Sequence, residues 1–282
     1  MGEHTSNAAR DPALPPVLWV VGPDFAASRS HPTTVTVERL LSGRTTAARV
    51  RPGFGISPQQ WQDLATSIAH SPRAALLHLE GAPEAGVDAA RVLKHDPRNV
   101  LITDPLRADG RDHQTSTGTM AFDAGLAVPD GTEMILDHTI GQRHVPGMLI
   151  IEAMIQLVTA AVPRCLPADG ADDWIGVMHG CSFSFSHFTF PITARLHAAL
   201  RVTGGASTHR VPMTAEVTLC QAHRETAVGL FALNAFSSAR ISEIERSQEA
   251  GALDRAAGVE GATPCPGPAR QPTTASERTA SP

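Results

Sequence analysis

The chain has 282 residues, of which 42% are hydrophobic, and at about 150 residues per domain this length predicts one or two domains with a sizeable core. Its formal net charge of −5 at pH 7 argues against a protein that wraps nucleic acid or lies on an anionic membrane surface. Lys94 is the only lysine among the 23 Lys and Arg residues, so a Schiff-base mechanism would have a single candidate.

Both ends of the chain are rich in small residues and lack aromatic ones. Residues 1–16 and 248–282 consist largely of Gly, Ala, Ser, Thr and Pro, and we expect both segments to be disordered. The N-terminal segment has no apolar stretch of the kind found in secretory signal peptides. Four widely spaced cysteines without a C-x-x-C pair predict neither a disulfide framework nor a structural metal. A cytoplasmic protein with no metal or redox cofactor is therefore expected.

Residues 17–90 have a mixed α/β pattern. Val17–Gly22 and Ala74–Leu79 predict short buried strands. Ser57 is a suitable N-cap for a helix over 58–68, which has proline at its first position. The pattern predicts a small α/β segment, and nothing in the sequence indicates its role.

The pattern over residues 92–245 alternates with period two, which is typical of half-buried antiparallel strands. The expected strands cover 99–103, 120–128, 183–185, 196–202, 213–219 and 226–233. One long helix, Met148–Val162, interrupts them and is apolar nearly all round, so it should be buried on most sides. At ~1.5 Å per residue it is too short to cross a ~30 Å hydrocarbon core. A curled antiparallel sheet wrapped around this helix, an α+β hotdog fold, is the economical arrangement.

The buried helix also carries a polar stripe. Glu152, Gln156 and Thr159 are spaced i, i+4 and i+7, so they share one face. Burying a carboxylate costs several kcal/mol unless it is paired or lies in a polar cleft. An acidic residue at this position therefore needs a structural or functional reason.

Two histidines, His138 and His144, precede this helix in a loop that ends at Pro146–Gly147. The helix N-terminus offers free N–H groups and a partial positive charge, which suit the polarisation of a thioester carbonyl. Taken singly, Glu152 could accept a core hydrogen bond and the histidines could cap a loop. Together, a titratable base, a buried acid and a helix amino end favour catalysis.

The same residues resemble the active-site segment of the hotdog β-hydroxyacyl-carrier-protein dehydratases. The resemblance rests on the H-x-x-G pattern at 138–141 and the P-G-x-L-I-I-E-A-x-x-Q pattern at 146–156. The catalytic histidine and the helix carboxylate of that family stand about 14 positions apart, as His138 and Glu152 do here.

A closer resemblance is to the A-factor biosynthesis (AfsA-like) hotdog family, over about residues 92–239. The motifs are D-H-T-I-G-Q at 137–142, H-V-P-G-M at 144–148 and E-A-M-I-Q at 152–156, with K-H at 94–95 upstream. The resemblance implies transfer of a β-ketoacyl group from an acyl carrier protein or CoA thioester to the hydroxyl of dihydroxyacetone phosphate. The products of that family are γ-butyrolactone-type signalling molecules.

Two features depart from that family. Its members have two hotdog halves whereas this chain has one set of motifs, so a homodimer would supply the missing half. Ile155 stands where an arginine commonly precedes the glutamine, which removes one candidate for holding a phosphate.

The resemblance implies a role for each motif residue. The thioester carbonyl would lie at the Gly147 amide, with His138 as general base and Glu152 as general acid or as the group that orients a hydroxyl or water. His144 is the reserve candidate for the base. The expected substrate-binding residues are Gly141, Arg143, Gly147 and Gln156. Lys94, Arg98 and Arg143 are the nearest cations that could meet a phosphate.

Two other functions remain open from the sequence. The protein could dehydrate a β-hydroxyacyl thioester or hydrolyse a thioester, for which the His138–Glu152 spacing is the main support. It could also be a non-catalytic acyl-binding module, which would be favoured if those two side chains lie far apart.

Overall fold

The computed structural model describes residues 14–25, 31–43, 46–108, 118–136, 143–166, 174–205 and 210–257. The chain divides into two compact units, Met1–Ala239 and Arg240–Pro282. The first unit contains both a small parallel sheet and a large antiparallel sheet, and it carries all the described site residues.

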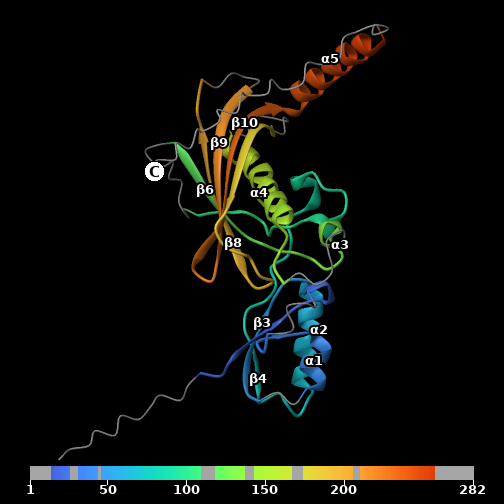
Figure 1. The fold of residues 1–282 in the computed structure, drawn as a ribbon, viewed down its shortest axis with the longest axis vertical. Helices are drawn as coiled ribbons and strands as arrows, with labels where there is room; N and C mark the ends of the chain where they lie inside the picture. Colours follow the sequence, from blue (N-terminus) through green and yellow to red (C-terminus); the bar gives the residue numbers. More distant parts are fainter. Residues whose placement is uncertain are drawn as a thin grey trace, which may run out of the picture. The chain divides into compact units, whose positions relative to one another are not determined.

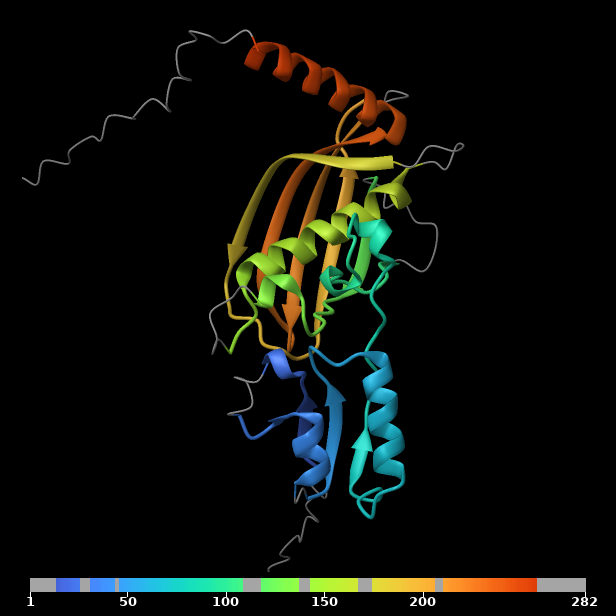
Figure 2. The ribbon, with the colours of Figure 1, turned by 90° about the vertical axis from the view of Figure 1, so that its right-hand side faces the viewer.

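The antiparallel sheet has six strands in the order β5-β6-β8-β9-β10-β7. Their bounds are β5 (Leu106–Arg107), β6 (Thr119–Gly125), β8 (Ala194–Val202), β9 (Arg210–Gln221), β10 (Arg224–Ser237) and β7 (Trp174–Phe185). Helix α4 (Gly147–Ala161) carries the chain from β6 to β7 at the far edge, so it must cross the sheet. Figures 1 and 2 show α4 lying along one face of the curved strands. The expected hotdog fold is confirmed.

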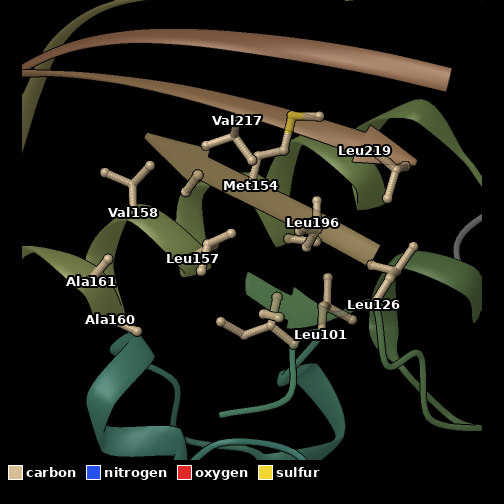
Figure 3. Close-up of a cluster of buried hydrophobic side chains, with 14 of the residues drawn as sticks. Leu101, Leu126, Met154, Leu157, Val158, Ala160, Ala161, Leu196, Val217 and Leu219 are labelled. Carbon is tan, nitrogen blue, oxygen red and sulfur yellow. The ribbon is translucent and has the colours of Figure 1, made fainter. Parts of the chain in front are cut away.

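The core lies between α4 and the inner face of the sheet. Strand residues alternate between buried and partly exposed, as period two requires, whereas nine of the fifteen α4 residues are buried. Figure 3 shows Leu157 and Met154 of α4 meeting Leu196, Val217 and Leu219 of the strands. Full burial of each such side chain contributes ~2 kcal/mol. This packing is what positions the polar residues of α4.

The apolar stretch is longer than expected, because the 3₁₀ helix η4 (Val162–Cys165) follows α4 directly. Over Gly147–Cys165 the length and the mean hydropathy of 1.5 would allow a membrane crossing, so shortness does not exclude one. Most α4 residues are nevertheless buried against the sheet, as in the core helix of a hotdog fold.

The predicted strand over 99–103 is wrong. Pro97–Asn99 forms the 3₁₀ helix η3, capped by the Asp96 side chain, and Ile102 and Thr103 make only isolated bridges. The physical reason is a side chain that lies far away in the sequence. Gln156 of α4 binds the backbone of this segment and takes the place of a neighbouring strand.

The α/β segment forms a four-stranded parallel sheet in the order β2-β1-β3-β4. Its elements are β1 (Val17–Val20), β2 (Thr34–Val35), α1 (Val37–Ser42), β3 (Ala48–Pro52), α2 (Pro58–Ala69) and β4 (Leu77–Leu79). Both helices lie on one face of the sheet, as Figures 1 and 2 show, over a separate apolar core. Ser57 caps α2 in a capping box with Gln60, which confirms the predicted helix start.

Backbone hydrogen bonds join this segment to the loops that follow β6 and precede β8. The Phe54 and Gly55 N–H groups donate to the Pro191 and Val128 carbonyls. Gly55 has a φ of +78°, and a Cβ there would lie 2.4 Å from an oxygen of Asp130. Burial raises the pKa of the Asp130 carboxyl to about 6.

At the other end, helix α5 (Ser238–Ala257) covers part of the tail that was expected to be disordered. That expectation is wrong for residues 248–257, and the residues after them lie outside the described part of the chain. The stretch is rich in Ala, Glu and Arg, which are strong helix formers.

Candidate functional site

A buried glutamine organises the middle of α4. Gln156 is 1% exposed, and its Nε2 donates to the Asn99 carbonyl at 2.8 Å and to Glu152 Oε1 at 3.0 Å. Its own Oε1 accepts the Leu101 N–H at 2.8 Å. The buried amide is thus satisfied, and it ties the polar stripe of α4 to the 99–101 segment.

The carboxylate of Glu152 also forms an ion pair, with Lys94. The Lys94 Nζ lies 2.6 Å from Glu152 Oε1, and the two side chains are 29% and 17% exposed. The Gln156 amide and the Lys94 ammonium contact the same carboxylate oxygen. Within the described residues, Glu152 Oε2 accepts no hydrogen bond and is open to a further donor.

An unusual backbone conformation directs Lys94 towards Glu152. Lys94 follows the 3₁₀ helix η2 (Ala89–Val92), and between them Leu93 has a φ of +56° in the left-handed region. This region costs a non-glycine residue ~1–2 kcal/mol. Leu93 is 66% exposed, so burial of its side chain does not offset that cost. Strain of this kind at a single residue often accompanies a functional arrangement.

The N-terminus of α4 is open. Pro146 is the N-cap residue and provides no side-chain hydrogen bond. In the described part of the chain the N–H groups of Gly147 and Met148 have no acceptor, and both residues are exposed. The Val145 N–H donates to the Thr189 carbonyl at 2.8 Å, which fixes the loop just before the helix. Free N–H groups at a helix start attract a partial negative charge.

His144 packs against an aromatic ring beside this helix end. Its imidazole is half-buried, and the ring centroids of His144 and Phe188 are 4.6 Å apart. No hydrogen bond joins His144 to Glu152 among the described residues. His138 and Gly141 lie outside the described residues, so the expected pairing of His138 with Glu152 stays a prediction.

The structure separates the cations that were expected near phosphate. Arg98 pairs with Asp96 at 2.6 Å and Arg143 is exposed, whereas Lys94 is engaged with Glu152. Sequence reasoning missed this ion pair. One feature of the sequence indicated that Lys94 is special: it is the only lysine among the 23 Lys and Arg residues, and all the others are arginine.

An apolar surface adjoins the open helix end. Met148, Phe185, Phe188 and Phe190 are between 46% and 67% exposed, and the Phe185 ring lies near Gly147. Strand β7 is an edge strand of the sheet, and none of its residues is buried. A long apolar edge of this kind is suited to pairing with another strand.

A metal site and a reactive thiol are two further kinds of candidate site. The described residues contain no cluster of three or more His, Cys, Asp or Glu side chains that could hold a metal. Burial raises the pKa of the Cys165 thiol to about 12, which keeps it from acting as a thiolate nucleophile at neutral pH.

A separate cavity of about 410 Å³ lies between the β3–α2 loop and the ends of β6 and β8. Its charged side chains are engaged, since Arg195 pairs with Glu84 at 3.0 Å and Asp130 accepts the Asp24 N–H. Glu152 does not line this cavity.

Comparison with known proteins gives one family. The family model described as the A-factor biosynthesis hotdog domain (AfsA) matches residues 79–237. No curated protein matches the chain. Similar solved structures include a conserved protein from Pseudomonas aeruginosa at 15% identity, covering 53% of this chain and 100% of that one with a TM-score of 0.35. A hot-dog-like protein from Thermanaerovibrio acidaminovorans, at 12% identity, covers 45% and 89% with a TM-score of 0.35. A thioesterase from Haemophilus influenzae, at 8% identity, covers 43% and 80% with a TM-score of 0.32.

Proposed function

The chain belongs to the A-factor biosynthesis (AfsA) hotdog family, and on this premise we propose that it is an acyltransferase. It moves a β-ketoacyl group from an acyl carrier protein or CoA thioester to the hydroxyl of a small acceptor. The product would enter the synthesis of a γ-butyrolactone-type signal or a related secondary metabolite. The donor brings its own phosphopantetheine arm, so the protein itself needs no cofactor.

The observation that carries this proposal is the Glu152 carboxylate on α4, with one oxygen open, near the uncapped start of the same helix. The helical rise puts the Glu152 Cα ~7.5 Å along the axis from that of Gly147. Helical side chains lean towards the N-terminus, and Oε1 is held by Gln156, one turn towards the C-terminus. A scissile carbonyl and an acceptor hydroxyl fit within such a span.

In the proposed reaction the thioester carbonyl oxygen accepts hydrogen bonds from the Gly147 and Met148 N–H groups. These donors stabilise the negative charge that develops on the oxygen. On binding, the acceptor hydroxyl donates its single O–H to Glu152 Oε2, which positions the oxygen; during attack the O–H turns to His138, which takes the proton as general base. The new C–O bond forms, the C–S bond breaks, and the leaving thiolate takes the proton back from His138.

A homodimer is part of the proposal. Family members with two hotdog halves pair them within one chain, whereas the described residues of this chain form one antiparallel hotdog sheet. Strand β7 offers 12 residues of open edge, and the exposed Met148 and Phe185 lie beside the start of α4. Pairing of β7 with its copy across a two-fold axis would join two sheets and cover these side chains.

The test is product analysis by intact mass after mixing the protein with a β-ketoacyl and a β-hydroxyacyl carrier-protein thioester, with and without dihydroxyacetone phosphate. Acceptor-dependent loss of the acyl group supports the transferase. Glu152→Gln and His138→Ala should abolish it. Glu216→Gln, a carboxylate on the outer face of the same sheet, should not.

Other products would identify the other candidate functions. Loss of one water from the hydroxyacyl donor would indicate a dehydratase, and acceptor-independent release of the acid would indicate a thioesterase. Binding of the donor without any turnover would indicate an acyl-binding module. Each of these results contradicts the transferase.

A further inference from the structure

We propose that Lys94 is a positioning residue that grips one oxygen of the Glu152 carboxylate and leaves the other oxygen free for the substrate. The proposal rests on the proposed function, because it assigns Lys94 a part in the work of Glu152. It adds to the site a residue outside the α4 motif, and it explains why that residue is a lysine.

The contact geometry supports a one-oxygen grip. Gln156 Nε2 donates to Glu152 Oε1 at 3.0 Å, and the Lys94 ammonium forms an ion pair with the same oxygen at 2.6 Å. Gln156 is itself fixed by two backbone groups of the 99–101 segment, so it defines where Oε1 lies. Because two groups hold Oε1, the orientation of the carboxylate is restricted and Oε2 is held by neither of them. Oε2 can therefore accept a hydrogen bond from a substrate hydroxyl.

The identity of the cation supports the same interpretation. An ammonium is a compact point charge and can meet a single oxygen, whereas the planar guanidinium fork tends to engage both oxygens of a carboxylate. All other Lys and Arg positions in this chain are arginine. An arginine at position 94 would keep the charge but would also cover Oε2. Lysine is thus the cation that holds Glu152 without blocking it.

The backbone before Lys94 points to a selected arrangement. Leu93 adopts the left-handed conformation although it has a side chain, and the Lys94 N–H then donates to the Ala89 carbonyl at 2.9 Å. Val92, just before this turn, is 3% exposed and anchors the segment in the core. The chain therefore turns sharply at Leu93 and brings the following side chain over α4.

The first experiment uses the fact that Lys94 is the only lysine. Reductive methylation of the full chain with ¹³C-formaldehyde labels one side-chain amine and the terminal amine, and Lys94→Arg identifies the lysine signal by its loss. Glu152→Gln should shift the Lys94 methyl resonance, and Glu216→Gln should leave it unchanged. An unchanged resonance in Glu152→Gln would overturn the proposal whether or not the protein has any activity.

The second experiment separates positioning from a merely structural role. Lys94→Met should lower kcat for acyl transfer by about 10–100-fold with KM within about 3-fold of the unmodified chain. Lys94→Arg should keep the thermal midpoint yet still lower kcat, because its fork closes Oε2. Full kcat in Lys94→Arg or in Lys94→Met would refute the one-oxygen grip. If the unmodified chain turns over no thioester, the proposed function fails, and the methyl resonance still decides the Lys94–Glu152 contact.

Discussion

Replacement of Gln156 by leucine tests the buried bridge between α4 and the 99–101 segment. The two side chains are similar in volume, so the main change is the loss of hydrogen bonds. The Leu101 N–H loses its acceptor, and the Asn99 carbonyl and Glu152 Oε1 each lose a donor. Leu101 is 1% exposed, so water cannot replace the lost acceptor. An unsatisfied buried donor costs ~1–3 kcal/mol, and with the weakened acceptors we expect Gln156→Leu to lower the free energy of unfolding by about 2–4 kcal/mol.

The assay is urea unfolding followed by circular dichroism, with the slope of free energy against urea compared between variants. A matched control exists in Gln59, whose side chain also pairs with an acidic residue one helical turn away, Asp63, but on the exposed face of α2. Gln59→Leu should cost less than ~0.5 kcal/mol. Equal losses in Gln59→Leu and Gln156→Leu would refute the reasoning, since Gln156 is buried and holds two backbone groups whereas Gln59 is exposed and pairs only with a side chain.

Three further predictions concern other parts of the chain. The pKa of Asp130 is raised to about 6, so its contribution to stability is present below the unfolded value near 4 and is lost as the pH rises through 6. Asp130→Asn should therefore reduce the change in unfolding free energy between pH 4 and pH 7, measured by urea unfolding at both pH values. At pH 7, after allowance for solvent screening, the variant should be more stable than the unmodified chain by roughly 1 kcal/mol. Leu93→Gly should be more stable than Leu93→Ala by about 1 kcal/mol in the same assay, because only glycine adopts the left-handed region without strain; equal stabilities would mean that the turn is not strained. The double variant Ser182→Lys and Ser184→Lys should sediment as a monomer while the unmodified chain sediments as a dimer, because charges on an open edge oppose strand pairing; a dimer in both would place the contact elsewhere.

Most of the hotdog sheet and its helix followed from the sequence because burial imposes a regular period. The apolar stretch over 148–162 is predicted as a core helix, and the structure has α4 at Gly147–Ala161 with most of its residues buried. The alternating stretches became β6, β8, β9 and β10; the last three are longer than predicted, whereas β6 ends at Gly125, three residues early. Hydrophobic periodicity indicates which side chains face a core, so it predicts correctly those helices and strands whose structure is determined by burial.

The errors have a common cause in interactions that periodicity does not record. The 99–103 segment has the composition of a strand, but its backbone groups bind the Gln156 side chain, a contact across more than fifty positions. The Lys94–Glu152 ion pair depends on a left-handed turn at a leucine, where sequence rules expect glycine or asparagine. Residues 248–257 were judged by their small residues, although alanine, one of the commonest of them, is the strongest helix former.

Two polar residues of α4 differ in what they contribute to stability: the fold depends on Gln156 but not on Glu152. Gln156 satisfies buried backbone atoms that water cannot reach. Glu152 and Lys94 both keep partial access to water, so either can be hydrated when the other is removed. A partly exposed ion pair contributes little to stability, and Glu152→Gln should therefore change the unfolding free energy by less than about 1 kcal/mol. A loss as large as that of Gln156→Leu would make Glu152 a structural residue and would remove the main support for catalysis. A small loss would mean that the Glu152 carboxylate on the core helix does not stabilise the fold, although a strained turn at Leu93 holds its partner Lys94 in place. Chemistry at Oε2 would then explain why a carboxylate is present there.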